Sequence, residues 1–397
     1  MNKLKQAEVN IGVIGHVDHG KTTLTSKLTG RWTDRHSEEI KQGISIKLGY
    51  ADAEFYKDPT IEGITSYCSS KKHPLTGNKT ELVRKVSFVD TPGHETLMAV
   101  MLSGATLLNG AILVVAANEE CPQPRTIEHL MALKMHGLKN IVVAQNKIDL
   151  VSKDKAIENY NNLRAFLDKE GYKDAPIIPT SAHFDTNIDA LIYALIKYIP
   201  VPKFKEDVPL RMQIVRSFDV NIPGTNINDL KGGILGGAIL EGNIKVGQKV
   251  FIYPGIEKPL EFEVVSLNAG DCSIDKAIPG GLIAVGTKLD PFICYSDKMV
   301  GQIICDEKSK PIVSNNFDII YNAVEILKDS NKTKIKVGEK IVIVIGSAAH
   351  LALVKKVKND FMELILSKPA VFYKLDKVAI SRNINSRWRL SGYGEVK

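Results

Sequence analysis

A glycine-rich stretch near the N-terminus has the composition and spacing of a phosphate-binding loop. Residues 15–22 read Gly-His-Val-Asp-His-Gly-Lys-Thr, which fits the pattern G-x-x-x-x-G-K-[ST]. Glycines let backbone N–H groups curl around phosphate oxygens, Lys21 can reach the outer phosphates, and the Thr22 hydroxyl can bind Mg²⁺. An ordinary glycine-containing turn is the alternative, but a strand pattern precedes this stretch and a helix pattern follows it. We predict a nucleoside triphosphate site made by Val17, Asp18, His19, Gly20, Lys21, Thr22 and Thr23.

A second group of residues could recognise the base. Asn146-Lys147-Ile148-Asp149 follows an apolar run, so it lies at the carboxyl edge of a strand, where open α/β sheets bind ligands. The Asp149 carboxylate can accept from both N1–H and the 2-amino group of guanine, whereas adenine offers neither donor in that geometry. The backbone of Ser181-Ala182, with His183 next to it, can donate to guanine O6. Two such sites after the phosphate motif predict that GTP and GDP are the ligands.

Residues that could act on the γ-phosphate follow a third strand pattern. In Asp90-Thr91-Pro92-Gly93, the aspartate can hold Mg²⁺ through water and the Gly93 N–H can contact the γ-phosphate. His94 comes next and can orient or polarise the attacking water, the role that a glutamine has in other GTPases. The alternative for His94 is a surface histidine without a chemical role. We expect GTP hydrolysis to depend on His94, Lys21 and Asp90.

A loop-like stretch after the first helix pattern could act as a switch. In Gln42-Gly43-Ile44-Ser45-Ile46, the Ser45 hydroxyl can give Mg²⁺ another ligand when the γ-phosphate is present. A loop of this kind becomes ordered with the triphosphate and loosens after hydrolysis. The predicted ligands of the main magnesium ion are therefore Thr22, Ser45 and Asp90.

Short apolar runs alternate with helical patterns in the first half of the chain. The strand candidates are Asn10–Ile14, Lys85–Val89, Ala111–Ala116, Asn140–Gln145 and Ile177–Thr180. The helix candidates are Lys21–Leu28, Thr96–Leu108, Thr126–His136, Ile157–Lys169 and Ile188–Ile199. This alternation predicts an α/β domain, a mostly parallel sheet with helices on both faces. The polar segment Tyr56–Thr80 has no clear period, and we expect an exposed insertion loop there.

The character of the chain changes at Pro200-Val201-Pro202-Lys203, which closes the last helix pattern. Beyond it, short β-branched runs are separated by Gly, Pro and Asn, which predicts two small all-β barrels. The expected domains are a GTP-binding domain at 1–202, a first barrel at 203–312 and a second barrel at 313–397.

Composition limits the class of protein. A chain of 397 residues with 44% hydrophobic and 24% charged residues is typical of a globular protein with two or three domains. It contains no apolar run of about 18 residues and no signal-peptide core, so we expect no membrane partner. The five scattered cysteines fit a reducing compartment, and we predict a cytoplasmic protein. A net charge of +7 permits an RNA or ribosome partner without requiring one.

With these motifs in place, the whole chain resembles the gamma subunit of archaeal and eukaryotic translation initiation factor 2, within the elongation factor Tu group. The resemblance extends almost from end to end. It rests on the stretches Val9–Thr23, Lys41–Tyr50, Phe88–Gly104, Leu113–Ala117, Arg216–Gly224, Leu230–Gly237, Pro279–Asp290 and Ala379–Val396. The stretches beyond the first domain separate this family from GTPases in general.

The resemblance implies a GTP-binding domain with two β-barrels, in a heterotrimer with alpha and beta subunits. It implies that the complex brings initiator methionyl-tRNA to the small ribosomal subunit in the GTP state. By residue, it suggests Asp18 and Gly43 as contacts to a second magnesium ion, and Val17 and Ile44 as an apolar gate before His94. Arg216 and Gly232–Gly237 are candidates for holding the aminoacyl end, although glycines in a barrel turn are an equal alternative.

The chain departs from the family pattern in two places. Ser45 stands where the family usually has threonine, so a hydroxyl is kept for magnesium. Many members carry a four-cysteine zinc knuckle in the loop that matches Tyr56–Thr80, where this chain offers only Cys68 and, at most, His73. A structural zinc site needs four ligands, so we expect no structural zinc.

Three other functions remain possible from the sequence. The GTPase subunit of a sulfate-activating enzyme shares the phosphate loop and barrels, but it lacks the matches in the second domain and the tail. A selenocysteine-specific elongation factor is also a tRNA carrier, but it normally continues into an extra C-terminal domain. A scaffold locked on its nucleotide would not hydrolyse GTP, and the presence of Lys21, Asp90 and His94 argues against it.

Overall fold

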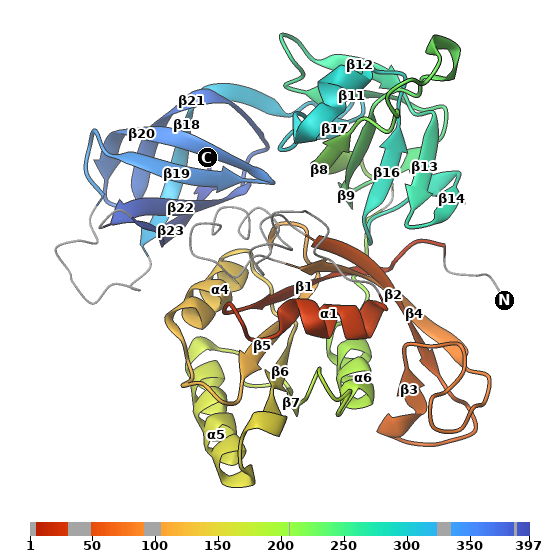
Figure 1. The fold of residues 1–397 in the computed structure, drawn as a ribbon. Helices are drawn as coiled ribbons and strands as arrows, with labels where there is room; N and C mark the ends of the chain where they lie inside the picture. The colour runs from red at the N-terminus through yellow and green to blue at the C-terminus, as the bar shows by residue number, and fades with distance from the viewer. Residues whose placement is uncertain (1–4, 31–48, 91–104, 206, 324–334, 385–386) are drawn as a thin grey trace. The chain divides into compact units, whose positions relative to one another are not determined.

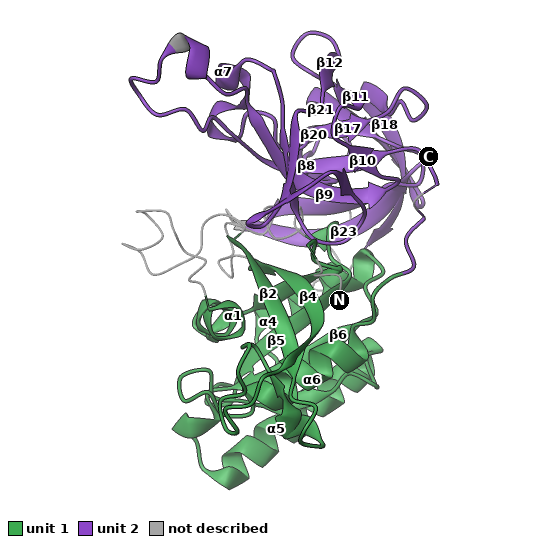
Figure 2. Cartoon of the chain, turned by 90° about the vertical axis from the view of Figure 1, so that its right-hand side faces the viewer, with its two compact units in different colours: residues 1–202 green, residues 203–397 purple. Residues whose placement is uncertain are grey.

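The computed structural model describes residues 5–30, 49–90, 105–205, 207–323, 335–384 and 387–397. The chain divides into two compact units, Met1–Pro202 and Lys203–Lys397, which Figure 2 shows in different colours. Within the described ranges, no helix combines the length and the apolar character that crossing a bilayer requires.

The first unit is built on a sheet of seven strands (Figure 1). They are β1 (Val9–Gly15), β2 (Gly49–Lys57), β3 (Tyr67–Cys68), β4 (Glu81–Asp90), β5 (Gly110–Ala116), β6 (Ile141–Asn146) and β7 (Ile177–Pro179). Their order is β3-β2-β4-β1-β5-β6-β7, and the strands from β4 to β7 pair in parallel. β2 and β3 are added antiparallel at the β4 edge.

Helices pack on both faces of this sheet, and the alternation of side chains along the strands explains why. The side chain of Ile112 belongs to a core shared with α1 (Lys21–Thr29) and α6 (Ile188–Tyr198). That of Leu113, one residue on, belongs to a core shared with α4 (Pro124–Met135) and α5 (Lys153–Glu170). Successive strand residues point to opposite faces, so a continuous apolar run is what a sheet covered on both sides requires. The predicted α/β fold is confirmed.

Most predicted elements of the first unit form, with shifted ends. The helix predicted from Ile157 begins at Lys153, because the Ser152 hydroxyl accepts a hydrogen bond from the Lys155 N–H and caps the helix. The helix predicted from Thr126 begins at Pro124, a residue suited to the first turn. The helix predicted at Thr96–Leu108 lies largely outside the described residues.

Strand β2 was not predicted. It lies between β4 and the two-residue strand β3, and its buried residues Ala51, Ala53 and Phe55 alternate with more exposed ones. Two of these three side chains are alanines, which give a weak apolar signal, so the period of two was easy to miss.

The segment after β2 differs from the exposed loop that we expected. It contains the 3₁₀ turn η1 (Ile64–Ser66), strand β3 and an isolated bridge between Lys72 and Lys79. It also buries five polar or thiol-bearing residues, Asp58, Ser66, Cys68, His73 and Thr80. We call residues 58–80 the insertion lobe.

The second unit contains two antiparallel β structures. The first is an eight-stranded sheet in the order β12-β11-β17-β8-β9-β16-β13-β14, with a separate pair β10 and β15. The ranges are β8 (Arg211–Phe218), β9 (Ile234–Glu241), β10 (Ile244–Lys245), β11 (Lys249–Tyr253), β12 (Leu260–Glu263), β13 (Ser266–Ala269), β14 (Cys272–Ile274), β15 (Lys276–Ala277), β16 (Ile283–Gly286) and β17 (Ile303–Cys305). The short helix α7 (Pro291–Cys294) precedes β17.

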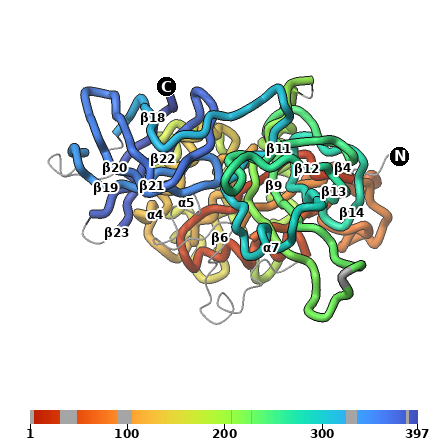
Figure 3. Tube along the Cα trace, turned by 90° about the horizontal axis from the view of Figure 1, so that it is seen from above, coloured from red at the N-terminus to blue at the C-terminus, as the bar shows by residue number. Residues whose placement is uncertain are grey.

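The second structure is a closed barrel in the order β18-β21-β20-β19-β22-β23, whose trace can be followed in Figure 3. Its strands are β18 (Ile312–Ala323), β19 (Lys340–Ile345), β20 (Ala348–Lys358), β21 (Phe361–Phe372), β22 (Lys377–Ile384) and β23 (Arg387–Val396). The barrel packs on the eight-stranded sheet through an apolar cluster that includes Ile303 and Val371, and through polar contacts. Arg211 donates to both carboxylate oxygens of Asp376 at 2.8 Å, and the Gln213 side chain donates to the Ser347 hydroxyl at 2.9 Å. The predicted all-β second half is confirmed.

Candidate nucleotide site

The phosphate loop connects the end of β1 to the start of α1, as the motif predicted. Two of its residues must be glycine. A Cβ on Gly15 would lie 2.3 Å from the Val114 carbonyl oxygen, and one on Gly20 would lie 2.5 Å from the Asn146 side-chain nitrogen. Gly20 also has a φ of 88°, which is in the left-handed region that glycine adopts at low cost. The loop can therefore adopt this conformation only with glycine at positions 15 and 20.

The residues expected to hold the outer phosphates and magnesium lie together at this loop. Lys21 begins α1, and its Nζ donates to the His16 carbonyl oxygen at 2.7 Å. The Thr22 hydroxyl donates to Oδ2 of Asp90, the last residue of β4, at 3.0 Å. A hydroxyl beside a carboxylate is an oxygen-donor set of the kind that Mg²⁺ prefers. These two side chains therefore fit a magnesium ion.

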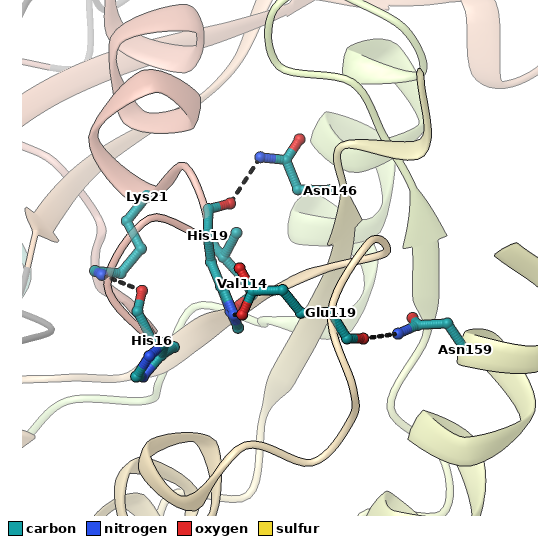
Figure 4. A network of polar contacts seen from close by, with 7 residues as sticks. All are labelled: His16, His19, Lys21, Val114, Glu119, Asn146 and Asn159. Carbon is teal, nitrogen blue, oxygen red and sulfur yellow. Dashed lines mark hydrogen bonds and ion pairs between the residues drawn. The ribbon is translucent and has the colours of Figure 1, made fainter. Parts of the chain in front are cut away.

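Asn146 joins three segments of the site, and Figure 4 shows its bond to His19. Its amide nitrogen donates to the His19 carbonyl oxygen at 2.9 Å, and its amide oxygen accepts from the Ala182 N–H at 3.0 Å. The side chain is buried, and a buried polar group that loses its partner costs about 1–3 kcal/mol. The amide therefore fixes the phosphate loop and the loop at 181–183 relative to β6.

The loops expected to recognise the base are tied to each other. Lys147 has a φ of 61°, and after it the 3₁₀ turn η3 (Ile148–Leu150) presents Asp149 on the surface. The Ile148 N–H donates to the Thr180 carbonyl oxygen at 3.3 Å, which connects this turn to the residue before Ser181. His183 is exposed, whereas Ser181 and Ala182 are buried. A carboxylate and a backbone loop thus lie at neighbouring strand ends, as base recognition requires.

Two buried histidines support the phosphate loop from behind. His19 is fully buried, and its Nδ1 donates to the Val114 carbonyl oxygen at 3.0 Å. Its Nε2 lies 3.2 Å from Glu119 Oε2. Burial lowers the pKa of His19, while its contacts with Val114 and Glu119 act in the opposite direction. The His19 side chain therefore points toward the sheet, and only the His19 backbone lies on the phosphate side of the loop.

The second histidine, His129 of α4, accepts a hydrogen bond from the Gly15 N–H on its Nδ1 at 3.2 Å. Burial, with added repulsion from Lys21 and Arg125, lowers the pKa of His129 to about 3. The ring is therefore neutral at physiological pH, which keeps Nδ1 available as an acceptor. Through this bond α4 holds the first residue of the phosphate loop.

Sequence reasoning did not single out this supporting layer. Besides His129, it contains Glu119, whose carbonyl accepts from Asn159 at 3.0 Å, and Gln145, whose amide donates to the Asn159 side chain at 2.9 Å. The available signal was His129, a histidine on the apolar face of a predicted helix. It is weak evidence for a functional role, because such histidines are often part of the structural core.

Several predicted site residues lie outside the described part of the chain. They are Gly43, Ile44, Ser45, Gly93 and His94. The described part contains the other predicted contacts. Asp18 is exposed with a φ of 63°, and Val17 and Thr23 are half-buried.

The glycines suggested for the aminoacyl end have a packing explanation. A Cβ on Gly232 would lie 2.0 Å from the Thr287 carbonyl oxygen, and one on Gly237 would lie 2.0 Å from that of Gln213. Arg216 forms an ion pair of 3.0 Å with Asp297. Close approach of backbone segments thus accounts for these glycines, which supports the alternative of a structural role.

Two family models match separate parts of the chain. The model of the elongation factor Tu GTP binding domain matches residues 6–201. The model of the C-terminal part of initiation factor eIF2 gamma matches residues 313–396, which coincide with the closed barrel.

Curated relatives match the chain over its full length. The translation initiation factor 2 subunit gamma of Methanocaldococcus jannaschii is 48% identical, covering 99% of this chain and 98% of the relative. The corresponding subunit of Pyrococcus horikoshii is 47% identical, covering 100% and 98%. That of Archaeoglobus fulgidus is 47% identical, covering 100% and 96%.

Solved structures share the fold at lower identity. A bacterial selenocysteine-specific elongation factor superposes with a TM-score of 0.75 at 26% identity, and this chain spans 58% of that longer protein. The elongation factor SelB of Methanococcus maripaludis, in complex with a GTP analogue, has a TM-score of 0.75 at 21% identity and is covered to 80%.

Proposed function

The chain belongs to the gamma-subunit family of translation initiation factor 2, and from that premise we propose that it delivers initiator methionyl-tRNA to the small ribosomal subunit. The chain is a GTP-dependent initiation factor subunit and a GTPase. Delivery takes place in the GTP-bound state, within a heterotrimer of alpha, beta and gamma subunits. GTP hydrolysis then returns the factor to the GDP state, which releases the tRNA.

The observation that carries this proposal is the Asn146 amide. It joins the phosphate loop to the loop at 181–183, next to the turn that presents Asp149, in a chain whose full-length relatives include gamma subunits of translation initiation factor 2. One amide thus connects the loop that contacts the phosphates to the loop that contacts the base. The two loops are held in a fixed relation, as the binding of a whole nucleotide requires.

We assign the nucleotide contacts as follows. Asp149 reads the guanine edge with help from Asn146, Lys147 and the backbone of Ser181–His183. The phosphates lie on the N–H groups of residues 17–23, and Lys21 neutralises their charge. His94 orients the attacking water, and Gly93 contacts the γ-phosphate. These roles rest on the motifs and on the geometry of the described residues.

We propose that Thr22 and Asp90 hold the main magnesium ion, together with Ser45 in the GTP state. The Thr22 hydroxyl and the Asp90 carboxylate are in hydrogen-bond contact, which supports this assignment. When bound, Mg²⁺ neutralises charge on the β- and γ-phosphates. Asp18 and Gly43 are proposed contacts to a second ion, and this part of the proposal rests on the family resemblance.

The proposed organisation has three domains, 1–202, 203–312 and 313–397. It is supported by the compact unit that ends at Pro202 and by the change from one β structure to the next between Cys305 and Ile312. We propose that the protein acts in the cytoplasm, where its five free cysteines would stay reduced.

Sequencing the RNA that co-purifies with the protein tests the proposed cargo. The chain is purified from its own cells with a non-hydrolysable GTP analogue or with GDP, and the bound RNA is sequenced. We expect initiator tRNA to be enriched at least about tenfold over elongator methionine tRNA with the analogue, and no enrichment with GDP, because the cargo must prefer the GTP state.

The same experiment also tests the alternative function suggested by the similar solved structures, that of a selenocysteine-specific elongation factor. A selenocysteine-specific factor would retain the selenocysteine tRNA instead. Recovery of tRNAs in proportion to their cellular abundance in both nucleotide states would contradict the proposal and leave a GTPase without a tRNA cargo.

A further inference from the structure

The insertion lobe occupies the place where many family members carry a zinc knuckle, but its residues do not fit zinc. Cys68 and His73 are the candidate ligands, and a structural zinc site needs four. Among the described residues, no group of three or more His, Cys, Asp or Glu side chains is close enough to hold a metal ion. The lobe is nevertheless folded, so its polar core must be organised in another way.

The Asp58 carboxylate lies at the centre of the lobe. It is fully buried and accepts hydrogen bonds from both sides. Oδ1 accepts from the Thr60 hydroxyl at 2.6 Å and from the Thr60 N–H at 2.9 Å. Oδ2 accepts from the Thr76 hydroxyl at 2.6 Å and from the Asn78 amide at 3.3 Å. These hydrogen bonds lower the pKa of Asp58 to about 2, and the bond from the Thr60 hydroxyl makes the largest contribution. The carboxylate is therefore ionised at neutral pH.

This arrangement connects segments that are far apart in the lobe. Thr60 lies two residues after Asp58, whereas Thr76 and Asn78 lie 18 and 20 residues after it. The Asn78 amide also donates to the Thr60 hydroxyl at 2.8 Å, which closes the network. A single carboxylate thus joins the start of the lobe to its end, as a metal ion does in a knuckle.

Neither candidate zinc ligand is available for a metal. His73 is buried, its Nε2 donates to the Thr65 carbonyl oxygen at 2.8 Å, and its Nδ1 accepts from the Leu75 and Thr76 N–H groups at 3.4 Å. Both ring nitrogens are therefore engaged. The Cys68 thiol donates to the Ser70 carbonyl oxygen at 3.3 Å, whereas a zinc ligand would be a thiolate.

We infer that the insertion lobe is a metal-independent knuckle whose buried Asp58 carboxylate takes the organising role of zinc. Its bonds with Thr60 at one end of the lobe and with Thr76 and Asn78 at the other hold the two ends together, and His73 fixes the turn between them. The lobe is anchored to the rest of the unit by Tyr67, whose ring packs 5.3 Å from that of Tyr193 on α6. The knuckle therefore keeps its place and its shape without metal.

Limited proteolysis of the full chain tests this inference, because Lys71 and Lys72 are exposed trypsin sites inside the lobe. Asp58→Ala removes the acceptor of four hydrogen bonds, and we expect cleavage at these lysines to become at least about tenfold faster. Asp58→Asn keeps the size but replaces one acceptor oxygen by a donor, so we expect an intermediate rate. Glu62→Ala is the matched control, since it removes an exposed carboxylate from the same lobe, and we expect the wild-type rate.

Three measurements keep the inference testable even if a variant unfolds. GDP affinity reports whether the domain is intact, and we expect it to stay within about twofold of wild type in all three variants. The wild-type protein is also digested with and without a strong zinc chelator, and its zinc content is measured. We expect equal cleavage rates and far less than one zinc per chain. One tightly held zinc, faster cleavage with chelator, or wild-type cleavage of Asp58→Ala would overturn the inference.

Discussion

Asp149→Asn is expected to weaken GTP binding by about 10²- to 10⁴-fold and to raise the affinity for xanthosine triphosphate. The carboxylate can accept from N1–H and from the 2-amino group of guanine, and each charge-assisted bond contributes about 1.5–3 kcal/mol. An amide keeps one acceptor and turns a donor toward the 2-amino group. Xanthine has a carbonyl at that position, so the amide suits it.

Dissociation constants for both nucleotides, measured by competition with a fluorescent GDP, check this expectation. Asp154→Asn, at the exposed first turn of α5, is the matched control and should leave both constants unchanged. Unchanged GTP affinity in Asp149→Asn would remove this residue from the base site.

His94→Ala is expected to slow ribosome-triggered GTP hydrolysis by about 10²- to 10⁴-fold, the range that a positioned proton-transfer or water-orienting group supplies. GTP affinity should stay near wild type, because the proposed contact is with water and not with the ground-state phosphate. Single-turnover hydrolysis with ribosomal subunits measures the effect.

His94→Gln gives this test its internal control. Glutamine has the same role in other GTPases, so we expect it to restore part of the rate that alanine loses. Equal single-turnover rates in wild type and His94→Ala would exclude the assigned role. A parallel loss of GTP affinity would indicate that the residue supports the fold of the site instead.

The architecture of the first unit could be predicted from the sequence because the patterns that specify its strands and its phosphate loop lie within short stretches of the chain. Apolar runs such as Ala111–Ala116 and Ile141–Ala144 are buried on both faces of the sheet, and a continuous apolar run is the signal for such a strand. The phosphate loop is equally local, since the Gly20 conformation and the start of α1 at Lys21 follow from adjacent residues.

The sequence could not predict features that depend on contacts between distant residues. The bond from Gly15 to His129 spans 114 positions, and the one from Asn146 to His19 spans 127. No pattern within a window reports such contacts. The insertion at Tyr56–Thr80 was predicted, but its folded polar core was missed for the same reason, because Asp58 meets Thr76 and Asn78 only after the segment turns back on itself.

The same limit applies to glycines. Gly232 and Gly237 were candidates for holding the aminoacyl end, with a structural role as the equal alternative, and the backbone of Thr287 and of Gln213 lies where a side chain would be. Close packing in the eight-stranded sheet is a sufficient reason for glycine at both positions. Residues that match a family motif can therefore be required for the fold, for ligand binding or for both.

The most direct test of the central claim is protection of the methionyl ester of initiator tRNA against spontaneous hydrolysis. The reconstituted heterotrimer and the lone chain are each titrated against the aminoacylated tRNA with a GTP analogue and with GDP. We predict half-protection at a protein concentration at least about tenfold lower with the analogue, because a cargo that favours one state must bind that state better. Elongator methionyl-tRNA should stay poorly protected in both states. Equal protection with GTP analogue and GDP, or equal protection of the elongator tRNA, would contradict the account.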